Sequence, residues 1–194
     1  MITYKNFMKK ARMIDVLDEQ LYESSRTFPD RKKEGYFPYI PYVYLSDLYM
    51  VFLEIWMRNL EYKQVDKEIR FLDVGCGTGR VVKLAEIFGF KSFGVECLEN
   101  VAMIGRNAYG LSEERLIWAD AFDLDEEFLS RFDAIYTYMP IADRELMGKL
   151  HMHLVSKSRK NDSSYGNTLF VEMLPRYYPV CNKVTTHRYF IGKC

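Results

Sequence analysis

Apolar and polar positions follow two different periods along the middle of the chain, and their alternation predicts an α/β sheet. Short runs of strand-forming residues occur at Ile69–Val74, Lys91–Glu96, Leu116–Ala119, Phe132–Met139 and Thr168–Leu174. Between these runs, apolar residues return every three or four positions, which is the spacing of a helix with one buried face. Strands that alternate with helices favour a doubly wound, mostly parallel sheet.

The N-terminal third predicts two helices before the sheet begins. Apolar residues recur at helical spacing over Tyr4–Glu23, which indicates an amphipathic helix with a polar outer face. We expect this helix to pack over the edge of the core; the alternative is a lid over a partner or substrate. A second helix is expected from a cap at Ser46 or Asp47 to about Tyr62.

An irregular aromatic segment, Arg26–Tyr44, separates the two helices. Its prolines exclude a continuous helix or a central strand. A segment with so many tyrosines and phenylalanines must pack on something, and two possibilities stay open. It covers a sheet edge, or it forms part of a ligand pocket, because such pockets are mostly apolar.

The composition is that of an ordinary globular protein whose net charge does not favour a charged partner. The chain has 194 residues, of which 48% are hydrophobic and 28% charged, and this length suits a single domain. We treat 1–194 as one domain, with N-terminal helices and an aromatic cap over 1–62 and a core over 69–194. Lysine plus arginine equals aspartate plus glutamate at 27 each, so no clear nucleic-acid signal exists.

Membrane, secretion and metal signals are also missing from the sequence. The most apolar stretch, Tyr49–Met57, is too short to span a bilayer, and Met1–Arg12 is not followed by an apolar signal region. The cysteines form neither a C-x-x-C pair nor a zinc pattern; they are Cys76, Cys97, Cys181 and Cys194. Reduced thiols indicate a cytoplasmic protein. His151 and His153 lie two apart on a predicted helix, so they share no face and no metal site is expected.

The strongest chemical signal is a glycine turn within Arg70–Val81. A buried strand leads into the glycine-rich turn Gly75–Gly79, and a helix starts at Arg80. Glycine lets the backbone turn sharply and approach a ligand closely, because it has no Cβ. The following helix directs its unpaired N–H groups and the positive end of its dipole into the same space. This combination predicts a nucleotide-binding element.

The spacing of the glycines distinguishes between families of nucleotide-binding proteins. Asp73 precedes Gly75, Gly77 and Gly79, and this D-x-G-x-G-x-G arrangement resembles the first motif of the class I S-adenosylmethionine-dependent methyltransferases. A nicotinamide-binding G-x-G-x-x-G turn would instead place its third glycine at position 80, which argues against a dehydrogenase. The resemblance implies a Rossmann-like fold and S-adenosyl-L-methionine as cofactor. It implies that Asp73 helps to hold the methionine amino end and that the loop binds the cofactor through Gly75, Cys76, Gly77, Thr78 and Gly79.

Two later positions extend the predicted site. Glu96 ends the second strand about 20 positions after Gly75, where an acidic residue accepts hydrogen bonds from a ribose diol. Cys97, in the turn after it, is counted with the cofactor-binding residues. Asp120 and Ala121 follow the third strand and resemble the family's third motif. That resemblance implies that the Asp120 carboxylate accepts from the adenine amino group while the Ala121 N–H donates to the ring.

The sequence gives less specific signals for the part of the site near the methionine end of the cofactor and the methyl acceptor. Some family members carry a Pro/Tyr segment that lines the methionine end of the cofactor, and Tyr39–Tyr44 looks similar, which makes Tyr42 a candidate. Tyr138 follows the fourth strand and is the candidate catalytic residue, for stacking on a flat substrate or hydrogen bonding. The alternative is that Tyr138 is a core aromatic. The sequence Tyr138–Ile141 departs from the Pro-Pro motif of methyltransferases that act on DNA bases, so it does not favour base methylation.

The C-terminal tail is shorter than the family pattern. Full members usually add a helix and then an antiparallel hairpin, whereas only Lys183–Ile191 has a strand pattern here. We therefore expect a sheet of about six strands with an abbreviated antiparallel C-terminal edge. The predicted function is methyl transfer to an unidentified small-molecule or protein acceptor. A non-catalytic nucleoside-binding scaffold or regulatory subunit is the alternative. The sequence identifies neither the acceptor nor the oligomeric state.

Overall fold

A computed structural model describes residues 2–25, 43–62, 68–138, 140–141, 143–158, 169–173 and 189–193. The predicted cofactor residue Tyr42 lies outside these residues, as does most of the Pro/Tyr segment. Cys181 and Cys194 also lie outside them, whereas Cys76 and Cys97 are free thiols.

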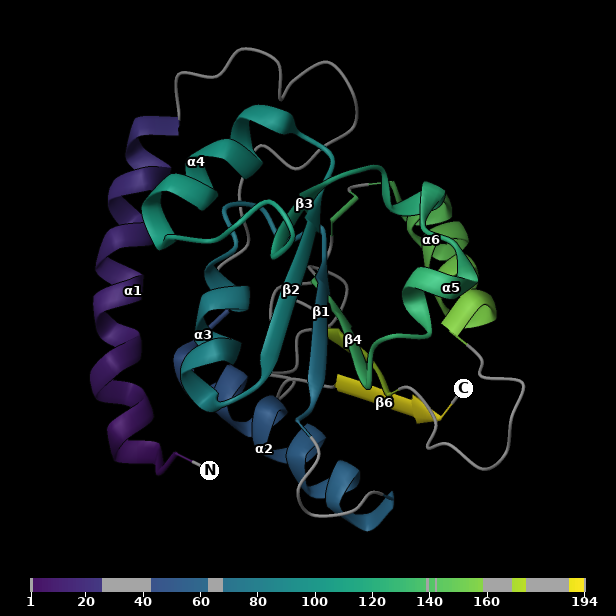
Figure 1. Ribbon diagram of the computed structural model, residues 1–194, viewed down its shortest axis with the longest axis horizontal. Coiled ribbons are helices and arrows are strands. Elements are labelled where there is room, and N and C mark those ends of the chain that lie inside the picture. Colours follow the sequence, from purple (N-terminus) through teal and green to yellow (C-terminus); the bar gives the residue numbers. More distant parts are fainter. Residues whose placement is uncertain are drawn as a thin grey trace, which may run out of the picture.

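A sheet with parallel strands at its centre organises the chain (Figure 1), as predicted. Its strand order is β3-β2-β1-β4-β5-β6, and β1 to β5 pair in parallel while β6 runs antiparallel to β5. The strands are β1 Arg70–Val74, β2 Lys91–Glu96, β3 Leu116–Trp118, β4 Ala134–Thr137, β5 Leu169–Met173 and β6 Tyr189–Lys193. The order reverses between β1 and β4, and in open α/β sheets ligands bind near such a reversal, beyond the carboxyl ends of the strands.

Helices cover both faces of the sheet, and Figure 1 shows α1, α3 and α4 on one side and α5 and α6 on the other. The helices are α1 Tyr4–Ser25, α2 Leu45–Tyr62, α3 Arg80–Phe88, α4 Glu99–Tyr109, α5 Glu126–Leu129 and α6 Arg144–Ser158. Side chains alternate across β1 because successive residues of a strand point to opposite faces. Phe71 joins the core under α1, α2 and α3, whereas Leu72 and Val74 join the core under α5 and α6.

The fourth strand is shorter than the sequence pattern predicted. Phe132 and Asp133 precede it instead of belonging to it. The Asp133 carboxylate accepts from the Arg70 N–H at 2.9 Å, and the Asp133 N–H donates to the Arg70 carbonyl at 2.8 Å. This reciprocal pair fixes where β4 enters the sheet beside β1, so that Phe71 lies opposite Ala134.

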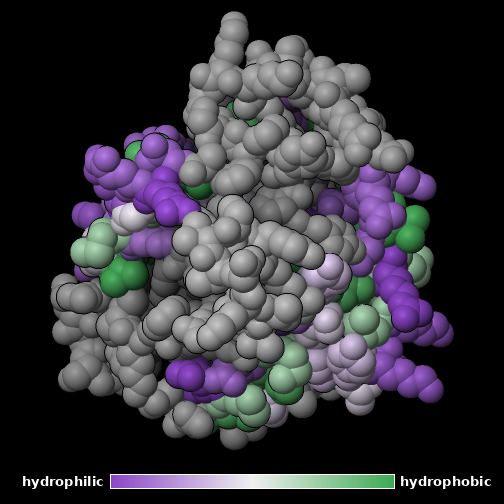
Figure 2. Space-filling view, turned by 180° about the vertical axis from the view of Figure 1, so that it is seen from behind, coloured by the Kyte–Doolittle hydropathy of each residue, from purple (hydrophilic) through white to green (hydrophobic). Residues whose placement is uncertain are grey.

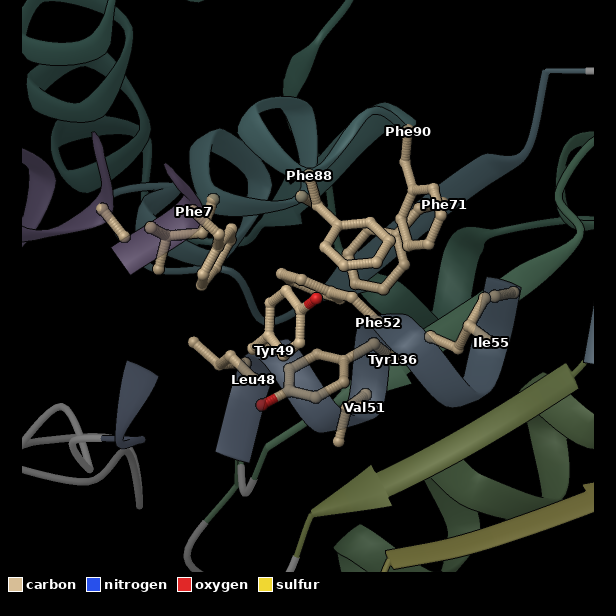
Figure 3. Packing of buried hydrophobic residues seen from close by; sticks show 14 of the residues in the cluster. Phe7, Leu48, Tyr49, Val51, Phe52, Ile55, Phe71, Phe88, Phe90 and Tyr136 are labelled. Carbon is tan, nitrogen blue, oxygen red and sulfur yellow. The ribbon is translucent and has the colours of Figure 1, made fainter. Parts of the chain in front are cut away.

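An aromatic cluster fills the core on the α1 and α2 face (Figure 3). Phe52 is its centre and meets Phe7, Phe71, Phe88 and Phe90 with ring centroids 5.5 to 6.2 Å apart. Tilted and edge-to-face contacts of this kind add to the free energy gained by burying each ring. The cluster therefore ties both N-terminal helices to the sheet.

The described outer surface is mainly hydrophilic in the view from behind, with isolated hydrophobic side chains (Figure 2). Met13 on α1 and Met152 on α6 are the most exposed of the large hydrophobic residues that the structure describes. Within the described part of the chain, no helix is both long and apolar enough to cross a membrane.

Candidate functional site

A cavity of about 330 Å³ opens at the carboxyl ends of β1, β2 and β3. Polar groups come from the turns that follow β2 and β3, and apolar side chains come from α6 and the segment before it. Its lining comprises Gly75, Val95, Glu96, Cys97, Ala119, Asp120, Ala121, Phe122, Pro140, Ile141, Leu146 and Leu150. The structure therefore brings five predicted site residues together around one cavity: Gly75, Glu96, Cys97, Asp120 and Ala121.

Glu96 connects the glycine loop to the turn after β2. One carboxylate oxygen, Oε2, accepts from the Gly77 N–H at 2.9 Å, and Oε1 accepts from the Leu98 N–H at 3.0 Å. The Cys97 thiol also donates to Oε1 at 3.5 Å. A carboxylate has about four acceptor positions, so after these three hydrogen bonds Glu96 keeps capacity for one hydroxyl donor from the cavity. Its orientation is thus fixed by backbone amides while part of its surface lines the cavity.

Asp120 occupies the position after β3 that the sequence indicated. Its Oδ1 accepts from the Phe122 N–H at 2.9 Å and caps the short 3-10 helix Ala121–Asp123. The side chain is exposed. The first N–H groups of a helix have no partner within it, so Ala121 presents a donor next to the Asp120 acceptor. An acceptor and a donor side by side suit the edge of a purine.

The glycine loop makes the sharp turn that the sequence predicted, and it does so with a left-handed backbone. Gly75, Gly77 and Gly79 have φ values of 73°, 57° and 85°. Gly75 is also crowded by a second segment: a Cβ placed there would lie 2.1 Å from the Pro140 Cβ. The N–H groups of Gly75 and Cys76 both donate to the Val95 carbonyl, at 2.9 and 3.0 Å. Of the three glycines, Gly75 lines the cavity, and the other two shape the turn behind it.

Asp73 and Cys76 are buried and do not line the cavity. Burial raises the pKa of Asp73 well above its usual value, and the nearby Glu96 charge adds to the rise. Burial likewise raises the pKa of the Cys76 thiol, with further contributions from Asp73 and Glu96. Asp73 thus carries a proton more readily than an exposed aspartate does. Its predicted contact with a methionine amino end stays a prediction.

Thr78 turns away from the cavity and bonds to α1. Its hydroxyl donates to the Asp18 Oδ1 at 2.8 Å, and the Tyr109 hydroxyl donates to the same oxygen at 2.7 Å. Burial, followed by the Asp18 charge, raises the pKa of Tyr109. Sequence reasoning missed Asp18 and Tyr109. The available signal was that Asp18 follows Ala11 by seven positions and so lies on the apolar stripe of α1, where a charge needs a partner.

Tyr138, the residue directly after β4, faces the aromatic core and does not line the cavity. Tyr138 is partly buried and packs against the aromatic cluster. Its pKa is raised by burial and then by the charge of Asp47. The side-chain oxygens of Tyr136 and Thr137 are buried and have no hydrogen-bond partner among the described residues. The catalytic role of Tyr138 stays a prediction.

Comparison with known proteins finds similarity in structure only. No protein-family model matches the sequence, and no curated protein matches it either. A hypothetical protein of Thermus thermophilus aligns over 78% of this chain and 87% of its own length, with 16% identity and a TM-score of 0.50. This likeness shows a shared fold.

Two further solved structures align less completely. An RNA methyltransferase of Salinibacter ruber, in complex with S-adenosyl-L-homocysteine, aligns over 62% of this chain and 74% of its own, with 23% identity and a TM-score of 0.43. The S-adenosylmethionine-bound amino pentose methyltransferase CalS10 of Micromonospora echinaspora aligns over 82% of this chain and 57% of its own, with 19% identity and a TM-score of 0.46.

Proposed function

We propose that this chain binds S-adenosyl-L-methionine in the cavity at the ends of β1, β2 and β3 and transfers its methyl group to a small-molecule or protein acceptor. The observation that carries the proposal is the meeting of two carboxylates from successive strand-to-helix turns, Glu96 and Asp120, with Gly75 around one cavity. The ribose diol offers two hydroxyl donors and adenine offers an amino donor. Glu96 offers an acceptor to the diol, and Asp120 offers one to the amino group.

The apolar wall of the cavity supports the same ligand class. Ile141, Leu146 and Leu150 lie opposite the polar turns and give a surface on which a purine would lose contact with water. Burying apolar area contributes roughly 25 cal/mol per Å². Mostly apolar walls with a few placed polar groups are typical of cofactor pockets. The donors and acceptors present therefore fit an adenosyl group.

The protein's own contribution to methyl transfer is orientation. S-adenosylmethionine, when bound, supplies a methyl group that is already activated by the sulfonium charge. Holding two reactants in line can contribute on the order of 7–11 kcal/mol of the barrier. Glu96 and Asp120 orient the nucleoside, and Asp73, at the end of β1, lies on the side where we place the methionine end. We place the acceptor beside Tyr138, where β4 leaves the sheet. No protein base is needed when the nucleophile is a neutral nitrogen or an oxygen or sulfur that is already ionised.

A pair of aspartates tests the nucleoside site with a matched control. Asp120 and Asp125 are both exposed, and each caps a helix by accepting from a backbone N–H, at 2.9 and 2.7 Å. Of the two, Asp120 lines the cavity. Asp120→Ala is expected to weaken binding of S-adenosyl-L-homocysteine by at least about tenfold in calorimetry. Asp125→Ala should leave the affinity unchanged, although each variant loses about 1 kcal/mol of capping energy.

Equal affinities in the two variants, or no binding by the wild type, would contradict the proposed site. Transfer itself is measured by incubating the protein with methyl-labelled cofactor and fractionated cell extract. Incorporation of label into an acceptor fraction is expected with the wild type and a reduced rate with Asp120→Ala. Binding without incorporation in any fraction would leave the nucleoside site standing and overturn the transferase proposal.

A further inference from the structure

A buried hydrogen-bond network joins α1 to the glycine loop on the side away from the cavity. Figure 1 shows α1 running beside α3 and α4, and the apolar residues Ile14, Leu17 and Leu21 of α1 pack against the core that contains Tyr109 of α4. Within this apolar contact, Asp18 is only 7% exposed. Its Oδ1 accepts hydrogen bonds from both Thr78 and Tyr109.

A second pair, of a buried arginine and a partly buried aspartate, lies one turn earlier on α1. Arg80, the first residue of α3, donates to the Asp15 Oδ1 at 2.8 Å and to the Val43 carbonyl at 3.1 Å. A cation at a helix N-terminus is opposed by the helix dipole. Burying charged groups also has a desolvation cost that apolar residues of similar size would avoid. Packing alone therefore does not account for these polar groups, which bond to the glycine loop, to the first residue of α3, to α4 and to the segment before α2.

The network continues from α1 to the cavity through the loop backbone. Thr78 is held by Asp18, and its neighbour Gly77 donates its N–H to the Glu96 Oε2 at 2.9 Å. Glu96 lines the cavity. The loop is thus bonded to α1 on one side and to the Glu96 carboxylate on the other. A shift of Thr78 would move the amide that orients Glu96.

We propose that Asp18 is a positioning residue for the nucleoside site, which acts through Thr78 and Gly77 to hold the Glu96 carboxylate in place for a ribose diol. The inference rests on the proposed function, because it takes the ribose as the group that Glu96 receives. It makes α1 part of the binding machinery. A purely structural role for Asp18 would change stability and leave selectivity alone.

The discriminating readout is the preference for ribose over 2′-deoxyribose. Calorimetric titrations of adenosine and 2′-deoxyadenosine are made with the wild type, Asp18→Ala, Asp18→Asn and Tyr109→Phe. The wild type is expected to prefer adenosine by about tenfold, since a hydrogen bond to a charged group is lost with the 2′-hydroxyl. Asp18→Ala should reduce that preference to less than about threefold. Asp18→Asn should restore it, because the amide oxygen can accept both hydrogen bonds.

Tyr109→Phe is the matched control. It removes the hydroxyl that donates to the same Asp18 oxygen and keeps the hydrogen bond between Thr78 and Asp18. We expect it to lower the thermal midpoint while it keeps the wild-type preference. If Asp18→Ala does not fold, Thr78→Val removes the same contact with a side chain of similar shape and should reduce the preference in the same way.

An unchanged preference in Asp18→Ala or Thr78→Val, with only the midpoint lowered, would overturn the positioning role and leave the proposed function intact. An equal loss of preference in Tyr109→Phe would also overturn it. A wild type that binds neither nucleoside would overturn the proposed function together with this inference. The wild-type titration therefore separates the two failures.

Discussion

Glu96 combines a structural and a proposed binding role in one carboxylate. Its two oxygens accept from the amides of Gly77 and Leu98, and the same side chain lines the cavity. Hydrogen bonds from two backbone segments reduce the conformational entropy that a ligand would have to remove on binding. At the scale of single residues, the site is thus preorganised by the folding of its own loop.

The contact between Gly75 and Pro140 leads to a prediction about stability. Gly75→Ala and Gly110→Ala both place a Cβ on a left-handed backbone, which costs about 1–2 kcal/mol. At Gly75 the new atom would also overlap Pro140, whereas nothing lies within 4 Å at Gly110. Gly75→Ala should therefore lower the free energy of unfolding in urea by about 1–3 kcal/mol more than Gly110→Ala. Equal losses of unfolding free energy in the two variants would show that Pro140 moves aside without an energetic cost.

The buried Asp73 leads to a prediction about pH. Burial and Glu96 raise its pKa in the folded state above the unfolded value of 3.8, so the folded protein holds this proton more tightly. The free energy of unfolding contributed by Asp73 therefore falls as the pH rises from the unfolded pKa through the folded one. Asp73→Asn should be more stable than the wild type at neutral pH, and this advantage should vanish toward about pH 4.

Urea unfolding of both proteins across this range measures the effect, with Asp125→Asn as an exposed control. An advantage for Asp73→Asn that grows as the pH falls would contradict the assigned cause. In the same variant, affinity for S-adenosylmethionine should fall while affinity for adenosine is unchanged, if Asp73 receives the methionine amino end as proposed. Stability gained at the expense of binding is a common pattern at functional sites.

At the scale of elements, α1 was predicted as an amphipathic helix that packs over the edge of the core, and the structure confirms its packing against α3 and α4. Periodicity alone identified the apolar stripe. The pattern did not reveal that Asp15 and Asp18 on its inner side bond to Arg80 and Thr78. The alternative of a lid received no support from these contacts, because α1 lies behind the glycine loop, away from the cavity lining.

Phe7 and Tyr4 of α1 provide a test of this packing. Phe7 is fully buried and its ring meets Tyr49, Phe52 and Phe88 at 5.3 to 6.2 Å. Phe7→Ala is expected to lower the free energy of unfolding by about 3–5 kcal/mol. Tyr4 is 48% exposed and touches Tyr49 alone among the described rings, so Tyr4→Ala should cost less than about 1.5 kcal/mol. Similar losses in chemical denaturation would mean that α1 is not anchored through Phe7.

At the scale of the whole molecule, the reversal of strand order brings distant segments to one edge. Gly75 follows β1, Glu96 ends β2 and Asp120 follows β3, and the parallel arrangement places these strand ends side by side. Pro140 and Ile141, which follow β4, close the cavity from the other side. The site is therefore a product of topology, because its two carboxylates, Glu96 and Asp120, come from separate segments of the chain.

Ligand selectivity of the folded protein is the prediction at this scale. A ligand present at 100 times its dissociation constant stabilises the folded state by about 2.7 kcal/mol. For a chain of this length that corresponds to a rise in thermal midpoint of roughly 5–10 °C. We expect this shift with S-adenosylmethionine and less than about 1 °C with NAD at the same concentration, because the third glycine is Gly79. Equal shifts would contradict the assignment of the pocket.

The candidate site was partly readable from the sequence. Gly75, Glu96, Cys97, Asp120 and Ala121 were placed in it from motif spacing, and all five line the cavity. Motif spacing could not separate them from Cys76 and Thr78, whose side chains point elsewhere. Motif spacing also did not predict Phe122 or the apolar residues of α6 as site residues. The α6 residues reach the site only through the packing of α6 on the sheet.

The sequence alone determined the local elements: the strand, the sharp glycine turn and the helix of residues 70–88 follow from backbone sterics and side-chain periodicity, which act over a few neighbours. Tertiary structure alone decided which elements touch. Asp18 bonds to Thr78, which lies 60 positions later in the sequence. Pro140, after β4, lies against Gly75, after the neighbouring strand β1. Such contacts depend on how whole helices and strands pack, and that information is distributed over the entire core.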